Sequence, residues 1–367
     1  MSAALLQVRD LRVTFSTPDG PLQAVRGVDF DLPAGTVMGV VGESGSGKSV
    51  TMLTVLGLTQ GAQVSGQALF EGRDLLAMSA AEQRKVRGAR IAMVFQDPLS
   101  SLHPHYRVGW QIAEMIRAHE PVSRAEARRR AVELLAMVGI PQPQRRIDDY
   151  PHQFSGGMRQ RVMIAMALAL RPRLLIADEP TTALDVTVQS QILDLLRRLQ
   201  AELGMAVIIV THDLGVIAEM AHEVLVMYAG QVVERAPRRA IYYRPHHPYT
   251  RGLLESLPAR TGLPGTLPAP GRAGSAQRQR LRPIAGQPPS LIRVPPGCPF
   301  HPRCPFVMDV CRREPPRLRP VDVNGSHESA CWLPPEAVGL GAEADARRRA
   351  AAGSGRIQPA EAGWGAA

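Results

Sequence analysis

One stretch limits the folds open to this chain more than any other: Gly42-Glu43-Ser44-Gly45-Ser46-Gly47-Lys48-Ser49. It fits the pattern G-x-x-x-x-G-K-[ST] in full, between a short apolar strand predicted at 37–41 and a helix predicted at 50–56. Glycines adopt backbone angles closed to other residues, so successive N–H groups can turn toward phosphate oxygens. Because a strand and a helix flank it, a chance match in a glycine-rich turn is disfavoured. The stretch predicts a nucleoside triphosphate site.

Single side chains of this phosphate loop, residues 42–49, have expected roles. Lys48 should reach the terminal phosphates, and the hydroxyl of Ser49 should bind Mg²⁺. The helix expected from Val50 should point its positive end at the bound anion. The loop by itself does not say what the hydrolysis drives.

Polar residues follow other predicted strands. Gln96 comes after an apolar strand expected at 90–95, and Asp178 and Glu179 come after one at 174–177. Ligand-contacting groups gather at the carboxyl ends of strands in α/β folds. Asp178 is therefore a candidate partner for Mg²⁺ beside the loop serine, and Glu179 a candidate to polarise an attacking water.

Two further features could contact a nucleotide. Ser155-Gly156-Gly157 precedes a helix predicted at 158–170, and a helix N-terminus can hold an anion. Phe15 ends a strand that alternates like an edge strand over residues 5–15. Its ring could stack on an adenine or belong to the core, and stacking is the favoured interpretation.

The basic charge is unevenly distributed. The formal net charge is +10, yet residues 238–320 alone hold fifteen arginines against three acids, a net of +12, which leaves −2 for the rest. The excess therefore lies in a C-terminal extension, away from the phosphate loop, which argues against simple nucleic-acid binding. Two interpretations stay open: a solvated basic surface, or contact with anionic lipid headgroups beside a membrane partner.

The chain is long enough for one large domain and a smaller one. We expect a nucleotide-binding domain at 1–257, an irregular linker rich in Pro, Gly and Arg at 258–297, a Cys-rich module at 298–335 and a disordered tail at 336–367. No apolar run approaches the ~20 residues of a membrane span, and no leader is evident. These features predict a soluble, cytosolic protein that can dock onto a membrane protein.

The four cysteines lie in one segment, with the spacing C-x5-C-x6-C-x19-C: Cys298, Cys304, Cys311 and Cys331. Such clustering in a cytosolic protein favours a metal site over disulfides. Structural zinc sites usually include a tight C-x2–4-C pair, which is missing here. We therefore favour a structural [4Fe–4S] cluster, with zinc or no metal as alternatives. His301 and His327 are candidate substitute ligands, although lining the loop is their favoured role.

Taken together, the motifs resemble the ATPase subunits of ABC transporters, in the order of that family. They are the phosphate loop at 42–49, the Q-loop Gln96, the signature Phe154-Ser155-Gly156-Gly157-Met158, the acidic pair Asp178-Glu179, the D-loop Asp185 and the switch histidine His212. The resemblance implies an α/β fold with a P-loop NTPase core (a RecA-like sheet), an antiparallel β subdomain and a helical subdomain carrying the signature. A small C-terminal Cys-rich extension completes it.

A finer resemblance is to the oligopeptide and dipeptide uptake class, over residues 5–333. Its marks are the segments 96–104, 150–161, 244–250 (Arg-Pro-His-His-Pro-Tyr-Thr) and the Cys-rich end from Gly297 to Pro305. Phe154 and Met158 depart from the wider family's usual Leu and Gln, but both are common in the peptide class. His103 stands where Asn is expected.

The resemblance implies that two such subunits face each other head to tail. The phosphate loop of one and Ser155-Gly156-Gly157 of the other would clamp one ATP. A triphosphate carries too much charge for one loop to neutralise, so a second helix N-terminus is physically reasonable. The implied nucleotide contacts are Phe15, Gly42, Glu43, Ser44, Gly45, Ser46, Gly47, Lys48, Ser49, Val50, Ser155, Gly156, Gly157 and Asp185.

The catalytic roles implied by the resemblance are divided among a few side chains. Ser49, Asp178 and Gln96 would organise Mg²⁺ and water, and Lys48 would hold the β and γ oxygens. Glu179 would act as the base. The remaining role falls to His212, which would sense the γ-phosphate.

The implied partners are a second, homologous ATPase subunit, two integral permease subunits and, indirectly, an extracytoplasmic peptide-binding protein. The chain would then sit at the cytoplasmic face of the plasma (inner) membrane. Gln96 and the following residues 97–109 would grip a cytoplasmic coupling helix of the permease; a plain surface loop is the alternative. The implied activity is ATP hydrolysis coupled to peptide import, with import of nickel or another small solute as the alternative.

Other classes of ATPase fit less well. DNA-repair and chromosome-organising ATPases with this head carry long coiled coils, whereas only short helices are predicted between Gln96 and Ser155. Translation factors with this head carry two copies of it, and this chain has one. Transport therefore remains the favoured function.

Overall fold

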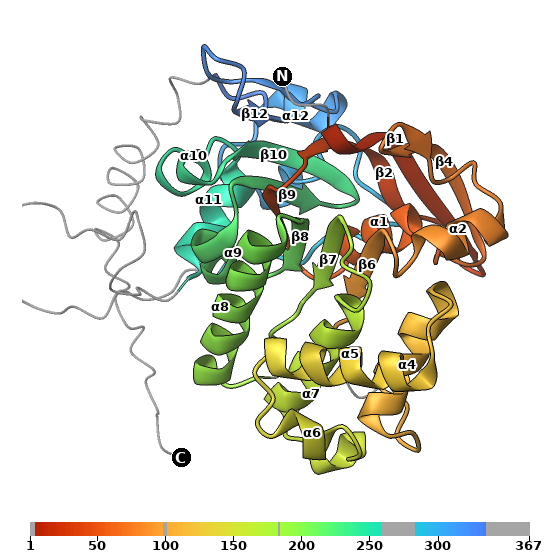
Figure 1. Cartoon of the computed structure of the whole chain (residues 1–367). Helices are drawn as coiled ribbons and strands as arrows, with labels where there is room; N and C mark the ends of the chain where they lie inside the picture. Colours follow the sequence, from red (N-terminus) through yellow and green to blue (C-terminus); the bar gives the residue numbers. More distant parts are fainter. Residues whose placement is uncertain (1–3, 98–100, 183, 258–282, 335–367) are drawn as a thin grey trace, which may run out of the picture.

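The computed structural model describes residues 4–97, 101–182, 184–257 and 283–334 (Figure 1). Its strands are β1 (Ala4–Thr17), β2 (Gly20–Pro33), β3 (Val37–Val41), β4 (Ala62–Phe70), β5 (Arg73–Asp74), β6 (Ile91–Val94), β7 (Leu174–Asp178), β8 (Ala206–Thr211), β9 (Glu223–Tyr228), β10 (Gln231–Pro237), β11 (Arg319–Pro320) and β12 (Glu328–Ser329). They form a four-stranded antiparallel sheet, β2-β1-β4-β5, and an eight-stranded sheet, β11-β12-β10-β9-β3-β8-β7-β6. In the larger sheet, β6, β7, β8, β3 and β9 run parallel to one another, whereas β10 pairs with β9 in the antiparallel direction.

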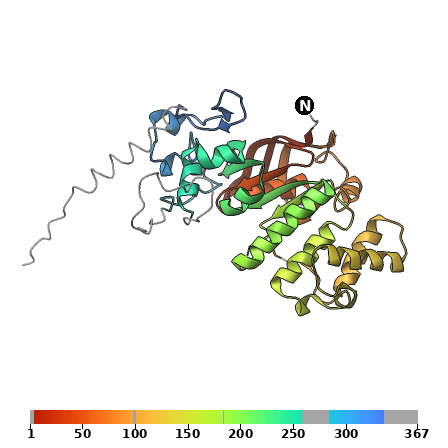
Figure 2. The same cartoon turned by 60° about the vertical axis from the view of Figure 1, so that its left-hand side comes forward.

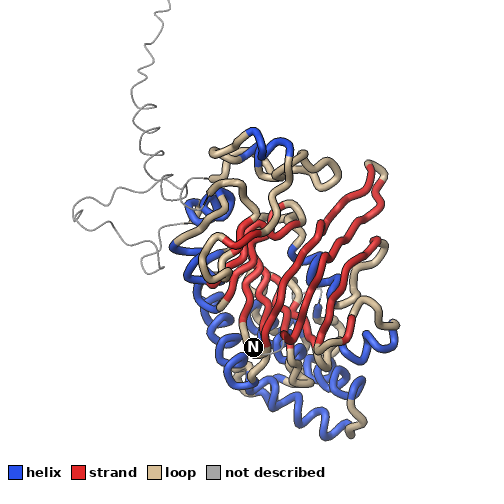
Figure 3. Tube along the Cα trace, turned by 90° about the horizontal axis from the view of Figure 1, so that it is seen from above, coloured by secondary structure: helices blue, strands red, loops and turns tan. Residues whose placement is uncertain are grey.

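The helices flank these two sheets (Figures 1 and 3). They are α1 (Lys48–Val55), α2 (Ala80–Val86), α4 (Val108–His119), α5 (Arg124–Met137), α6 (Pro143–Arg146), α7 (Gly156–Ala167), α8 (Val186–Leu203), α9 (Leu214–Met220), α10 (Arg238–Tyr243), α11 (Pro248–Glu255) and α12 (Asp309–Arg313), with 3₁₀ turns at Pro151–Gln153 and His301–Arg303. Helices α7 and α9 contact the larger sheet, whereas α1 contacts β1 and β2 of the smaller one. The phosphate loop therefore lies where the two sheets approach each other.

The central strands are apolar throughout because both of their faces are covered. Successive side chains of a strand point to opposite faces, and in β7 Leu174 and Ile176 join a core shared with α1 and the antiparallel sheet. Leu175 and Ala177 join a second core, shared with the helices α4, α5, α7, α8 and α9. A continuous apolar run followed by Asp178 is thus what a strand buried on both faces requires.

The first strand departs from its prediction. The alternation over residues 5–15 predicted an edge strand, but β1 pairs with β2 on one side and with β4 on the other. The prediction was wrong because alternation reports which face is buried and not whether both edges are paired. Two helix starts also differ: α1 begins at Lys48 and α7 at Gly156, each two residues before the predicted start.

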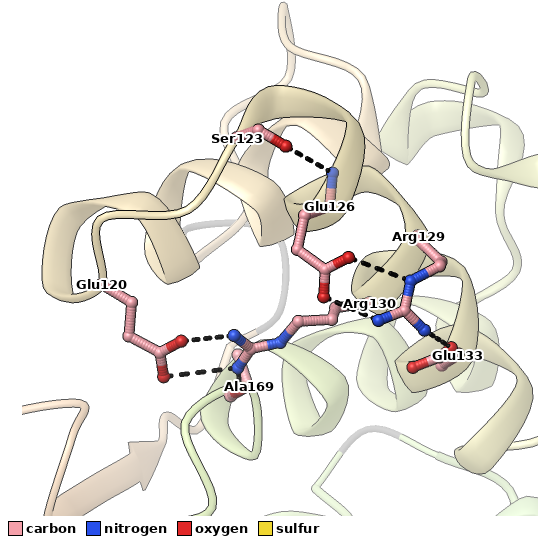
Figure 4. A network of polar contacts seen from close by, with 7 residues as sticks. All are labelled: Glu120, Ser123, Glu126, Arg129, Arg130, Glu133 and Ala169. Carbon is pink, nitrogen blue, oxygen red and sulfur yellow. Dashed lines mark hydrogen bonds and ion pairs between the residues drawn. The ribbon is translucent and has the colours of Figure 1, made fainter.

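Helices α4 and α5 stand beside α7 and form the helical part of the molecule (Figure 1). Ser123 caps α5 by accepting a hydrogen bond from the N–H of Glu126, at 3.2 Å. Arg130 of α5 pairs with Glu120 and donates to the carbonyl of Ala169, just after α7, at 3.2 Å (Figure 4). These contacts tie the two helices to the segment that carries the signature.

The Cys-rich segment adds strands to the main sheet. Glu234 and Arg235 of β10 pair with Ser329 and Glu328 of β12, and β12 also pairs with β11. In Figure 2 this segment, drawn in blue, lies next to α10, α11 and the end of the sheet. Residues 283–297 contain no helix or strand; the rest of the predicted linker and the predicted tail lie outside the described residues.

None of the helices described by the structure combines the length and the apolar character needed to cross a membrane.

Candidate nucleotide site

The phosphate loop is shaped by close backbone approaches that exclude larger residues. A Cβ atom on Gly42 would lie 2.2 Å from the carbonyl oxygen of Met227, and one on Gly47 would lie 2.5 Å from that of Ala24. Gly47 also has φ +97°, a left-handed backbone conformation that favours glycine. Both glycines that G-x-x-x-x-G-K-[ST] specifies, Gly42 and Gly47, are therefore required by packing, and Gly47 is required by the turn as well.

Lys48 is folded back onto its own loop. Its Nζ donates to the backbone carbonyls of Gly42 at 2.7 Å and Glu43 at 2.9 Å, and the residue is only 5% exposed. Burial lowers its pKa, while the neighbouring acids Glu179, Asp178 and Glu43 oppose that shift. The ammonium group thus lies inside the loop, held by two backbone carbonyls of the loop itself.

Ser49 and Asp178 meet at the ends of α1 and β7. The hydroxyl of Ser49 donates to Oδ1 of Asp178 at 3.0 Å, and Asp178 is 6% exposed. Burial raises the pKa of Asp178, with Glu179 adding to the rise and the Ser49 hydrogen bond and Lys48 opposing it. A hydroxyl beside a buried carboxylate offers two neighbouring oxygen ligands of the kind that Mg²⁺ prefers.

Glu179 is held by three side chains from other parts of the chain. Its Oε2 accepts from Nε2 of Gln96 at 3.0 Å and from Oγ1 of Thr182 at 2.8 Å, and its Oε1 lies 3.1 Å from Nδ1 of His212. Its backbone has φ +47°, in the left-handed region that disfavours a glutamate. The structure therefore brings together the polar residues that follow the predicted strands.

The pKa of Glu179 is set by opposing effects. Burial raises it, but hydrogen bonds with His212 and Thr182 and the charge of nearby Lys48 outweigh burial, so the pKa falls below the ordinary glutamate value. The carboxylate is consequently ionised near neutral pH. Thr182 had no role in the sequence prediction; its place three residues after Glu179, in the turn that follows β7, was the only signal.

The signature residues lie at the N-terminus of α7. Ser155 and Gly156 are exposed, and the Ser155 hydroxyl caps α7 by accepting from the N–H of Met158 at 3.4 Å. A Cβ atom on Gly157 would lie 2.6 Å from Val188 of α8. Asp185 is exposed and caps α8 by accepting from the N–H of Val188 at 2.9 Å. The signature and the D-loop therefore adjoin each other at the N-termini of two helices.

The remaining candidate contacts differ in exposure. Ser44 and Gly45 form the exposed tip of the loop, whereas Ser46 is 4% exposed. Phe15 is half-buried and packs against the core beneath the antiparallel sheet, together with Val50. The adenine-stacking role of Phe15 stays a prediction.

Sequence reasoning gave no role to two residues that contact the phosphate loop. Tyr249 accepts the N–H of Glu43 through its hydroxyl at 2.7 Å, and Arg303 pairs with the Glu43 carboxylate at 2.6 Å. Both residues lie in segments that mark the peptide class, but nothing in their spacing relates them to residue 43.

The four cysteines line one small cavity of about 10 Å³, together with Phe300 and His301. Burial raises the pKa of the Cys304 thiol to about 11, with Cys298 and Cys311 adding to the rise, and that of Cys331 to about 12, with the other three cysteines adding to it. Among the described residues, however, no group of three or more His, Cys, Asp or Glu side chains is arranged to hold a metal ion. The geometry thus lends the predicted iron–sulfur or zinc centre no support in this conformation.

His327 does not join the thiols. Its Nε2 lies 2.7 Å from Oε1 of Glu234, a fully buried residue that also accepts the backbone N–H groups of His246 and His247. His301 stays next to the cysteines, with its Nδ1 3.0 Å from the carbonyl of Cys298.

Two family models match the sequence. The one described as "ABC transporter" matches residues 25–182, and the one described as "Oligopeptide/dipeptide transporter, C-terminal region" matches residues 233–311. The oligopeptide transport ATP-binding protein OppD of Escherichia coli (strain K12) is 49% identical over 314 residues, which are 85% of this chain and 89% of that protein. The dipeptide transport ATP-binding protein DppD of Bacillus subtilis (strain 168) is 48% identical over 334 residues, 90% and 94% of the two chains.

Solved structures resemble the fold as well. The ATP-binding cassette MJ0796, in a dimeric post-hydrolysis state bound to ADP and Pi, has a TM-score of 0.58 at 28% identity and covers 64% of this chain and 98% of its own. The cbiO1 protein of Clostridium perfringens has a TM-score of 0.57 at 30% identity, covering 65% of this chain and 90% of its own. The chain therefore belongs to the family of ABC transporter ATP-binding proteins that carry the oligopeptide/dipeptide transporter C-terminal region.

Proposed function

We propose that this chain is the ATP-hydrolysing subunit that powers import of di- and oligopeptides through a membrane ABC transporter. The observation that carries the enzymatic part is the arrangement of Glu179 with Gln96 and His212 beside the Ser49–Asp178 pair. The names of the similar proteins, which transport oligopeptides or dipeptides, support the cargo class. Nickel or another small solute is the alternative cargo.

In the proposed reaction, the chain's own residues bind the triphosphate and position water. Lys48 exchanges its contacts with loop carbonyls for β and γ oxygens. Ser49 and Asp178, with Gln96, would hold Mg²⁺, which would neutralise charge on the phosphates. Glu179 is ionised, so it can accept a proton from the water that attacks the γ-phosphorus. Gln96 and His212 keep its carboxylate oriented, and His212 is exposed enough to meet a γ-phosphate from outside.

A second ATPase subunit completes the site in this proposal. Ser155 and Gly156 lie exposed at the N-terminus of α7, where backbone N–H groups can donate to an anion. Val186, next to the D-loop, is 68% exposed, as expected of an apolar side chain that a partner covers. A homologous subunit facing this one head to tail would bring its own signature to the γ-phosphate.

The membrane partners are proposed to bind on the α4 side. A cavity of about 750 Å³ is lined mainly by apolar side chains from β6, from Phe95 directly after it, and from α4 and α7, among them Met115 and Met166. Tyr106 and Trp110 are 45% and 49% exposed, and their rings stack at 4.3 Å. We propose that a cytoplasmic helix of a permease subunit docks here, along the 96–109 segment, at the cytoplasmic face of the plasma (inner) membrane. Residues 98–100 of that segment lie outside the described residues.

The proposed division into domains is the one predicted from the sequence, with the Cys-rich module at 298–335. We propose that its four thiols hold a [4Fe–4S] cluster, with one zinc ion as the alternative. The cavity has room for about one water-sized sphere, so a cluster requires the thiols to move apart. Iron and sulfide analysis of protein purified without air tests this proposal. One equivalent of zinc with no iron would show that the thiols bind zinc and not a cluster.

The transport proposal is tested by uptake. The chain is reconstituted in vesicles with the two permease subunits and the ATPase partner that co-purify with it, and a peptide-binding protein is added. Labelled tripeptide should accumulate in an ATP-dependent manner, and Ni²⁺ should not. Accumulation of Ni²⁺ without peptide would favour the alternative cargo, whereas accumulation of neither would contradict the transport role.

A further inference from the structure

We infer that Arg303 of the Cys-rich module is a positioning residue for the nucleotide site, which it serves by holding Glu43 of the phosphate loop. Its Nη1 lies 2.6 Å from Oε2 and its Nη2 2.9 Å from Oε1 of the Glu43 carboxylate. The pair is bidentate, and the Arg303 side chain is 5% exposed. Such charge-assisted pairs are the strong ones among hydrogen bonds. The inference deepens the proposed function, because it rests on the proposed ATP site.

The backbone of Glu43 is held from the same side. Its N–H donates to the hydroxyl of Tyr249, a fully buried residue of α11, at 2.7 Å. The ring of Tyr249 packs against those of Tyr228 and Phe300. The side chain and the backbone of one loop residue are therefore both fixed by groups that lie beyond residue 227.

Arg303 is itself rigidly placed. Its Nε donates to the carbonyl of Ala285 at 2.9 Å, and its backbone N–H donates to that of Phe300 at 3.0 Å. The guanidinium lies over the rings of Tyr228 and Phe300, 5.8 and 5.9 Å from their centroids. A guanidinium fixed in this way loses little further freedom when it pairs with a carboxylate.

Electrostatics gives the pair a second effect on nucleotide binding. The carbonyl of Glu43 accepts from Lys48, so the Glu43 backbone is part of the wall around the phosphate-binding ammonium. Without Arg303, the half-buried Glu43 carboxylate would oppose the triphosphate by like-charge repulsion. The arginine thus fixes the loop and offsets the charge of a carboxylate that stands next to the phosphates.

Arg303 also connects the Cys-rich module to the phosphate loop, because it adjoins a cysteine in the sequence and pairs with Glu43 in the fold. Arg303 directly precedes Cys304, and its 3₁₀ turn, His301–Arg303, begins three residues after Cys298. Any rearrangement of the thiols that moves this turn therefore moves the guanidinium held on Glu43. The C-terminal extension is part of the wall of the nucleotide site.

The test measures nucleotide affinity of the full chain with a fluorescent ADP analogue. Arg303→Ala should raise the Kd about tenfold, the equivalent of one lost charge-assisted hydrogen-bond pair. Arg303→Lys should raise it about threefold, because an ammonium cannot reproduce the bidentate fork. Arg312→Ala, at an exposed arginine of the same module, is the matched control and should leave the Kd unchanged. If Arg303→Ala does not fold, Arg303→Lys carries the test.

A double-mutant cycle separates positioning from general stabilisation of the module. In a Glu43→Gln background, Arg303→Ala should raise the Kd by less than about threefold, because its partner charge is already gone. At saturating ATP, kcat of Arg303→Ala should stay within about twofold of the unmodified chain while KM rises. An equal Kd change in both backgrounds, or none for Arg303→Ala and Arg303→Lys, would overturn the inference.

A further variant keeps this inference distinct from the proposed ATP site. Lys48→Ala should abolish measurable binding of the analogue. Unchanged binding in Lys48→Ala would show that the proposed site is wrong. If Lys48→Ala loses binding while the Arg303 variants bind normally, the proposed ATP site is supported and only the role of Arg303 is overturned.

Discussion

Gln96 donates a hydrogen bond through Nε2 to Oε2 of Glu179 at 3.0 Å, although 83 residues separate them along the chain. β6 and β7 are neighbouring parallel strands, so the residues that follow them meet at one edge of the sheet. The contact relates the segment proposed to meet the permease to the residue proposed to activate water. In the proposed mechanism, this hydrogen bond transmits a movement of the permease-facing segment to the carboxylate that activates water.

The hydrogen bond from Thr182 should tune the acid limb of the ATPase pH profile. Glu179 must be ionised to accept a proton, so activity falls as the pH drops through its pKa, which lies below the ordinary value. Thr182→Val removes a donor at 2.8 Å that lowers this pKa. The pKa should therefore rise, and the acid limb should move to higher pH. The pH dependence of kcat measures it.

The control for this shift is Thr187→Val, at an exposed threonine of α8. Its acid limb should coincide with that of the unmodified chain. A limb that stays in place in Thr182→Val, or moves to lower pH, would contradict the assignment of Glu179 as the base.

Glu234 of β10 should stabilise the packing of the C-terminal segments that carry His246, His247 and His327 against the main sheet. It is fully buried and accepts from the N–H groups of His246 and His247 at 2.6 and 3.0 Å, with His327 at 2.7 Å. Glu234→Ala leaves these buried donors without an acceptor, so the free energy of unfolding should fall by about 3 kcal/mol. Urea denaturation followed by circular dichroism measures the change.

Two companion variants define this effect. Glu234→Gln retains one acceptor oxygen and should lose about half as much stability. Glu202→Ala, at an exposed acid of α8, should change the free energy of unfolding by less than about 0.5 kcal/mol. Equal losses for Glu234→Ala and Glu202→Ala would show that the buried carboxylate stabilises nothing.

The exposed aromatic pair on the α4 side should matter for coupling and not for hydrolysis by the isolated subunit. Trp110→Ala removes the 49% exposed ring that stacks on Tyr106. An interface aromatic of this kind typically contributes about 2 kcal/mol to binding. Copurification with the permease subunits should therefore weaken by about tenfold or more, while ATPase activity of the chain alone stays unchanged. Undiminished copurification would place the permease elsewhere.

Much of the site could be predicted because its residues sit at strand ends. Apolar runs mark strands buried on both faces, and the polar residues that follow neighbouring parallel strands, such as Gln96 and Glu179, meet at one edge of the sheet. The glycines at 42 and 47 are explained by backbone approaches that the motif already implied. The parts of the fold that depend on local sequence pattern could therefore be predicted.

Contacts between distant segments could not be predicted in this way. Arg303 and Glu43 are 260 residues apart, and neither periodicity nor spacing encodes their pairing. The second edge of β1 was missed for the same reason, since pairing with β4 depends on the chain's return at residue 62. Clustering of the cysteines was visible in their spacing, but their separations in the fold depend on how the segment packs against β10.

The most direct test of the ATPase assignment replaces Glu179 by Gln. The substitution removes the charge that accepts the water proton but keeps an amide that Gln96 and Thr182 can contact. ATP hydrolysis by the full chain should fall by at least about 100-fold, while Mg·ATP binding persists and ATP-bound dimers accumulate in size-exclusion chromatography. Hydrolysis within about twofold of the unmodified chain would contradict the assignment of Glu179 as the base and, with it, the proposed mechanism.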